Sequence, residues 1–156
     1  MRISLVTVGM RMPAWVEQGY NEYAKRLPRE NALYLVEVQA FKRTKNTVTD
    51  VAMQSEGEKI LSAIPKNNKL VVLDERGKAW DTLQLAEQMN LWASSGQDVS
   101  LVVGGADGLS DAVKSKADKM WSLSPLTLPH PLVRVIVAEQ IYRAWSVMTN
   151  HPYHRA

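Results

Sequence analysis

The chain has 156 residues, no cysteine and a formal net charge of +3. Its length fits one domain spanning residues 1–156, and a hydrophobic fraction of 46% with a charged fraction of 22% excludes the disordered and membrane classes. Because cysteine is absent, disulfides, thiolate metal sites and a cysteine nucleophile are excluded, and we expect a cytoplasmic protein that uses no metal. No apolar stretch approaches the roughly 20 residues needed to cross a bilayer, so we expect no membrane contact.

The first half of the chain alternates strand and helix patterns. Apolar runs rich in β-branched residues predict strands at Ile3–Val8 and Leu33–Val38. A break at Pro13 precedes a helix whose apolar face is formed by Trp15, Val16, Tyr20, Tyr23 and Leu27. A second helix is expected over roughly Thr49–Ile64.

The second half continues this alternation. The expected elements are a strand at Leu70–Leu73, a helix from Asp81 to about Gly96, a strand at Val99–Val103, a short helix after Ser110, a weaker strand around Trp121–Leu123 and a long helix over Pro131–Thr149. Asp81 and Gln84 have the spacing of a capping box, and proline is favoured in the first turn of a helix such as the last one.

Strands that alternate with helices at this spacing predict an α/β fold, with a mostly parallel sheet covered by helices on both faces. In such sheets ligands bind beyond the carboxyl ends of the strands. We therefore expect the functional site in the loops that follow Leu73, Val103 and Leu123.

Two of these loops have unusual compositions. Residues 104–108 read Gly-Gly-Ala-Asp-Gly, which fits either a tight turn or a ligand-binding loop, and their spacing matches neither the Rossmann fingerprint nor the P-loop. Residues 123–131 are apolar but contain three prolines, so they predict a rigid, irregular loop packed against a ligand, another chain or the fold itself.

The last helix has apolar residues around most of its circumference, which requires burial on several sides. A symmetric homodimer would provide that burial, and a central position in a monomer core is the alternative. Glu139 and Arg143 have the spacing of an ion pair, and ion pairing is the default interpretation of Arg134 as well. Arg134 could instead hold a phosphate or an anionic transition state.

Two further segments carry polar chemistry. Lys42, Arg43 and Lys45 crowd the loop after the second strand, where they could track a phosphate backbone or simply be solvated. The three histidines all lie late in the chain, and the tail that holds two of them is either a frayed terminus or a reactive ending. Its residues of interest are His151, Tyr153, His154 and Arg155. Two histidines without a thiolate are too few for a zinc site.

Several motifs together resemble the RlmH-type enzymes of the SPOUT superfamily, the pseudouridine N3-methyltransferases of large-subunit ribosomal RNA. They are Val6-Thr7-Val8-Gly9, Leu73-Asp74-Glu75-Arg76-Gly77, Gly104-Gly105-x-x-Gly108, Leu126-Thr127-Leu128-Pro129-His130-Pro131-Leu132-Val133-Arg134-Val135, Glu139-Gln140-Ile141-Tyr142-Arg143-Ala144 and His151-Pro152-Tyr153-His154-Arg155. The resemblance spans the whole chain.

This resemblance implies a trefoil knot near the C-terminus, S-adenosylmethionine as cofactor, and a homodimer acting on 23S rRNA in the assembled 70S ribosome. Carried onto the matching positions, the residues that contact the cofactor are Leu73, Gly104, Gly105, Leu123, Ser124, Pro125, Leu126, Thr127 and Leu128. Ala106, Asp107 and Pro125 stand where the family varies.

For catalysis, we expect the acceptor imide to lose its proton to a positioned base while donor and acceptor are held in near-attack geometry. The candidate bases are His130, His154 and Glu139. Tyr153 would stack on the base, and Arg155 or Arg134 would balance charge. The rival hypotheses are a non-catalytic ribosome-binding factor, which would not bind S-adenosylmethionine, and a flavodoxin-like nucleotide-binding domain, for which the Walker lysine is missing.

Overall fold

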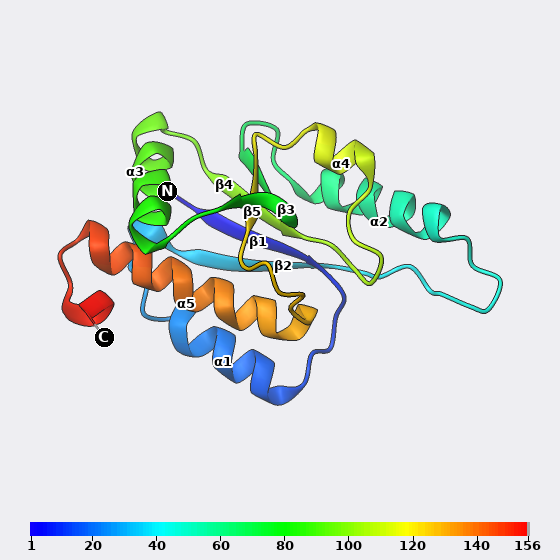
Figure 1. Cartoon of the computed structure of the whole chain (residues 1–156), viewed down its shortest axis with the longest axis horizontal. Helices are drawn as coiled ribbons and strands as arrows, with labels where there is room; N and C mark the ends of the chain where they lie inside the picture. Colours follow the sequence, from blue (N-terminus) through cyan, green and yellow to red (C-terminus); the bar gives the residue numbers. More distant parts are fainter. Residues whose placement is uncertain (156) are drawn as a thin grey trace.

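The computed structural model describes residues 1–155 and contains one five-stranded sheet (Figure 1). The strands are β1 Ile3–Val8, β2 Leu33–Val38, β3 Lys69–Ala79, β4 Val99–Val103 and β5 Lys119–Ser122. Their order across the sheet is β2-β1-β4-β3-β5, and every neighbouring pair is parallel. The predicted parallel α/β sheet is therefore confirmed.

Helices cover both faces of this sheet. They are α1 Ala14–Ala24, α2 Thr49–Ala63, α3 Thr82–Ser95, α4 Asp111–Ser115 and α5 His130–Met148, with short 3-10 turns η1 Arg29–Asn31 and η2 Pro152–Arg155. Alternate residues of β1 explain the two layers, since Ile3 and Leu5 pack under α1, α3 and α5, whereas Val6 and Val8 pack under α2 and α4. Both layers are visible in Figure 1.

The chemistry of the chain explains both ends of α3 and the start of α5. Asp81 accepts a hydrogen bond from the Gln84 backbone N–H, and the Gln84 side chain accepts one from the Asp81 N–H, which confirms the capping box. Gly96 ends α3 in the left-handed conformation, with a φ of 71°. Helix α5 begins one residue before Pro131, as expected for proline in a first turn.

Strand β3 is longer than the predicted Leu70–Leu73. Both Leu73 and Lys78 pair with Trp121, so residues 74–77 form a bulge and the strand resumes beyond it. The polar sequence of this bulge resembles a loop, which is why apolar patterning ends the strand too early. Gly77 is required there, since an added Cβ would lie 2.6 Å from the Met120 backbone.

Strand order alone does not define how the chain threads through itself, so the trefoil knot stays a prediction. None of the helices within residues 1–155 combines the length and the apolar character needed to cross a membrane.

Candidate functional site

A cavity of about 690 Å³ opens at the carboxyl edge of the sheet. The three loops expected to carry the site, those after β3, β4 and β5, all contribute to its wall. Among the predicted cofactor contacts the lining residues are Leu73, Gly104, Gly105, Leu123, Ser124, Leu126, Thr127 and Leu128. Pro125 is exposed and does not line the cavity.

The glycine loop after β4 is both a tight turn and a wall of this cavity. Gly105 and Gly108 form an isolated bridge in which the Gly108 N–H donates to the Gly105 carbonyl at 3.0 Å. Gly108 has a φ of 83°, and a Cβ on Gly104 would lie 2.7 Å from the Gly108 carbonyl carbon. Glycine at these positions therefore lets the turn close and the backbone face the cavity.

The proline-rich loop supplies an apolar wall. Its turn is fixed by the Ser124 side chain, whose Oγ accepts the Leu126 N–H at 2.9 Å, and by the Ser122 hydroxyl, which donates to the Ser124 carbonyl at 3.1 Å. Leu126 is nevertheless 74% exposed while lining the cavity. An exposed leucine on a rigid loop offers a surface for the apolar part of a ligand.

The cavity is also lined by charged residues that the sequence analysis did not name as site residues. Asp74 lies in the β3 bulge, where it accepts the Arg76 N–H at 2.8 Å and pairs with Lys114 of α4 at 3.4 Å. Burial opposes ionisation of this carboxyl, but the Arg76 N–H and the Lys114 ammonium outweigh burial and lower the pKa of Asp74. Its position just beyond the end of the predicted strand was the available signal.

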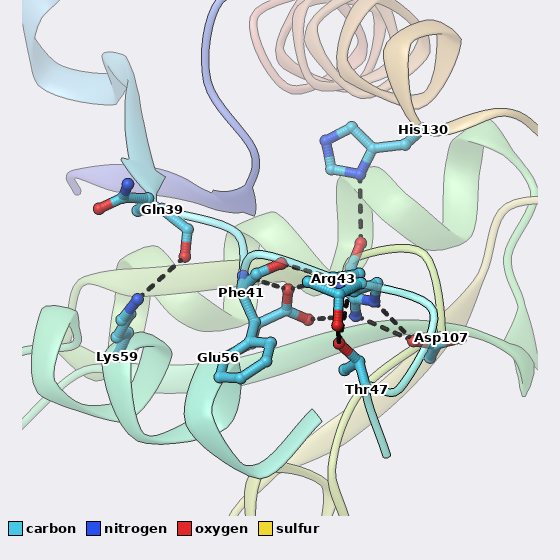
Figure 2. Close-up of polar contacts among 10 residues, drawn as sticks. Gln39, Phe41, Arg43, Thr47, Glu56, Lys59, Asp107 and His130 are labelled. Atoms are coloured by element: carbon cyan, nitrogen blue, oxygen red, sulfur yellow. Dashed lines mark hydrogen bonds and ion pairs between the residues drawn. The ribbon is translucent and has the colours of Figure 1, made fainter. Parts of the chain in front are cut away.

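His130 lies at the start of α5 and lines the same cavity. Its Nδ1 is 3.1 Å from the Gly104 carbonyl (Figure 2). Its Nε2 is 3.2 Å from the Arg134 Nε, which can only donate. This pattern requires a neutral ring with the proton on Nδ1. Burial and the adjacent Arg134 guanidinium accordingly lower the pKa of His130.

Arg134 is 2% exposed and makes its contacts inside the protein. Besides the contact with His130, it donates to Glu37 at the end of β2 at 2.7 Å and to the Gly9 carbonyl at 2.8 Å. The default interpretation, ion pairing, is confirmed. The proposed contact of Arg134 with a phosphate or a transition state stays a prediction.

The remaining candidate residues gather along the C-terminal half of α5, from Glu139 to the turn η2. Glu139 accepts from Arg143 at 2.6 Å, which confirms the predicted ion pair, and from the Tyr153 hydroxyl at 3.0 Å. Burial and this bond to Glu139 raise the pKa of Tyr153 to about 12. His154 Nδ1 lies 3.2 Å from the Ser146 hydroxyl, and Arg155 is exposed. The tail through Arg155 is thus a folded 3-10 turn on α5 rather than a frayed terminus.

Within residues 1–155 no group of three histidine, aspartate or glutamate side chains is placed to hold a metal ion.

Comparison with known proteins identifies the family. The family profile described as "Predicted SPOUT methyltransferase" matches residues 1–154. The chain is 56% identical over 155 residues to "Ribosomal RNA large subunit methyltransferase H" of Hahella chejuensis, and the match covers 99% of each chain.

Solved structures share the fold at low sequence identity. A methylase family protein from Haemophilus influenzae aligns with 97% of this chain and 69% of its own, with a TM-score of 0.54 and 14% identity. A methylase family protein from Neisseria gonorrhoeae aligns with 90% of this chain and 81% of its own, with a TM-score of 0.52 and 16% identity. With the profile match over almost its full length, the chain belongs to the SPOUT methyltransferase family.

Proposed function

We propose that this protein is an S-adenosylmethionine-dependent ribosomal RNA methyltransferase that modifies N3 of a pseudouridine in 23S rRNA of the assembled ribosome. The family supports methyl transfer, and the name of the Hahella relative supports ribosomal RNA as substrate. The observation that carries the proposal is the cavity at the carboxyl edge, which gathers all the predicted cofactor contacts except Pro125.

The residues of the cavity fit this cofactor. A volume of about 690 Å³ lies in the range of cofactor sites, roughly 300–1,000 Å³. Leucine side chains of the proline-rich loop offer apolar contact to the adenine, and the backbone of the glycine loop offers hydrogen bonds. When bound, the cofactor supplies an electrophilic methyl group on a sulfonium sulfur.

The chain must position the acceptor base and accept its imide proton. Neutral His130 lies on the cavity wall, but both of its ring nitrogens are engaged by Gly104 and Arg134. Of the other candidates, Glu139 lies at the middle of α5, and Tyr153, His154 and Arg155 lie in the turn η2 that follows this helix. We therefore propose that these groups reach the RNA in the cavity of a second copy of the chain.

Surface properties of α1 and α5 support this homodimer. Leu132 and Ile136 are only half-buried in a single chain, and Trp15 on α1 is 54% exposed. A two-fold interface across these helices would bury the apolar surface and place the tail of each subunit near the cavity of its partner.

The test uses purified protein, labelled S-adenosylmethionine and ribosomes from cells that lack their own enzyme. We expect label in one 23S rRNA nucleoside, identified after digestion as N3-methylpseudouridine, and less label with protein-free 23S rRNA. Calorimetry without ribosomes should show binding of the cofactor. A protein that bound ribosomes but not the cofactor would instead be a ribosome-binding factor, and label on another nucleoside would refute the assigned position.

A further inference from the structure

The loop between β2 and α2, residues 39–48, holds three cations that differ in environment. Lys42 and Lys45 are exposed, and neither forms an ion pair with another residue in the range 1–155. Arg43 is turned inward, with a side chain 28% exposed, and lines the cavity. Figure 2 shows its guanidinium between Glu56 and Asp107. One loop thus has an outward-facing pair of lysines and an inward-facing arginine.

Glu56 of α2 explains why the arginine turns inward. Its carboxylate is 2% exposed, and a charge buried to that degree needs charged or hydrogen-bonding partners. Arg43 donates from Nη1 at 2.9 Å and from Nη2 at 3.2 Å, and the Phe41 N–H adds a third bond at 2.9 Å. This bidentate contact requires a planar guanidinium, and a lysine ammonium could not form it.

The same guanidinium reaches the glycine loop. Arg43 Nε and Nη2 each lie 2.9 Å from Asp107 Oδ2, and Nη1 also donates to the Phe41 carbonyl at 3.3 Å. Hydrogen bonding to Glu56, opposed by burial and reinforced by Asp107, raises the pKa of Arg43. One side chain therefore connects helix α2, the β2–α2 loop and the glycine loop.

The glycine loop also rests directly on Glu56. A Cβ added to Gly105 would lie 2.9 Å from Glu56 Oε1 and 3.1 Å from the Val8 side chain. Gly105, Asp107 and Arg43 all line the cavity. The position of the glycine loop at the cavity is thus set by Glu56 next to Gly105 and by Arg43 bound to Asp107.

We propose that Arg43 is a positioning residue for S-adenosylmethionine: by clamping Asp107 to Glu56, it holds the glycine loop in the conformation that binds the cofactor. Lys42 and Lys45, on the outer side of the same loop, remain available to RNA phosphates. This proposal rests on the proposed function, because it takes the cavity to be the cofactor site.

The test measures cofactor affinity by calorimetry for the full-length protein and its variants. Arg43→Ala should raise the Kd for S-adenosylmethionine at least tenfold. Asp107→Asn should raise it about three- to tenfold while the melting temperature changes little, because Asp107 lies at the surface and Glu56 keeps its arginine. Lys59→Ala is the matched control: Lys59 of α2 contacts the same loop at the Gln39 carbonyl, away from the cavity, and its loss should change the Kd less than twofold.

A double-mutant cycle separates positioning from direct contact. If Arg43 acts through Asp107, the variant carrying both changes should bind no more weakly than Arg43→Ala alone. Multiplying effects would mean that each residue touches the cofactor independently and would overturn the proposal. An unchanged Kd in Asp107→Asn would also overturn it, by reducing Arg43 to a structural partner of Glu56. Absence of cofactor binding by the wild type would refute the proposed function itself.

Discussion

The two ends of helix α5 use similar polar residues in different ways. At its start, His130 and Arg134 bind inward, to backbone carbonyls of two loops and to Glu37 of β2. In its second half, Glu139 binds Arg143 and the Tyr153 hydroxyl of the tail. The start of α5 lines the cavity, whereas its second half holds the C-terminal turn at the opposite edge of the sheet (Figure 1).

This difference bears on how a catalytic site could form. His154 contacts Ser146, which lies 16 residues after His130 on a continuous helix, a separation of roughly 24 Å at 1.5 Å per residue. One subunit therefore cannot bring His154 to its own His130 while α5 stays intact. The expected grouping of these candidates needs a partner subunit, which is why we propose the homodimer.

The largest expected effect on methylation comes from removing the tail at the C-terminal end of α5. Deleting residues 153–156 should lower ribosome methylation at least about 100-fold, the scale of losing a positioned acid or base. The Kd for S-adenosylmethionine should change less than twofold, because the tail lies far from the cavity of its own chain. Filter-binding of labelled product and calorimetry provide the two measurements.

A mixing experiment identifies the subunit that supplies the tail. Gly104→Val keeps the tail but should not bind the cofactor, since even a Cβ there lies 2.7 Å from backbone. Each variant alone should be inactive, and unfolding and refolding them together should restore part of the activity through mixed dimers. Continued inactivity of verified mixed dimers would show that the tail does not act across subunits.

Most of the fold could be predicted because local chemistry decides it. The strands Ile3–Val8 and Val99–Val103 are buried along their whole length, and Leu33–Val38 forms an edge of the sheet. All three are mostly apolar and rich in β-branched or leucine residues, and their predicted bounds match those observed. The second half of β3 could not be predicted, because its extension depends on Trp121 pairing on both sides of a bulge. Pairing between distant residues cannot be predicted from the apolar pattern of the segment itself.

The loops of the candidate site could be predicted, because they follow the strands of a parallel sheet. The side-chain pairs inside the site could not be predicted, because they join residues from different elements. The rule that parallel sheets bind ligands at their carboxyl edge located the three loops of the cavity. It did not reveal that Arg43, described only as part of a basic loop, pairs with Glu56, since 13 residues and a turn separate them. The buried state of Glu56 is a tertiary property.

The next largest effect is on the free energy of unfolding, measured for one arginine in each half of α5. Arg134→Met should lower the free energy of unfolding by about 3 kcal/mol, because it removes a buried cation and leaves Glu37, the Gly9 carbonyl and the His130 ring without their donor. Arg143→Met should cost about 1 kcal/mol, because that pair lies nearer the surface and Glu139 keeps Tyr153. Urea denaturation of both variants measures the difference, and equal losses would contradict the contrast drawn between the two ends.

The smallest effect is the pH dependence contributed by His130. Burial and the Arg134 guanidinium lower its pKa in the folded state, so the unfolded chain takes up a proton more readily once the pH falls below about 6.5. The stabilisation is complete above that pH and is lost as the pH falls toward the folded pKa. Glu37 faces the ring as well and opposes the shift, but it does not reverse it. Between pH 7.5 and 5, wild-type stability should therefore fall more steeply than that of His130→Gln, whose amide can replace both hydrogen bonds without titrating. Parallel slopes in urea denaturation would mean that the imidazole is free to protonate in the folded protein, and the neutral ring inferred from its two contacts would then be wrong.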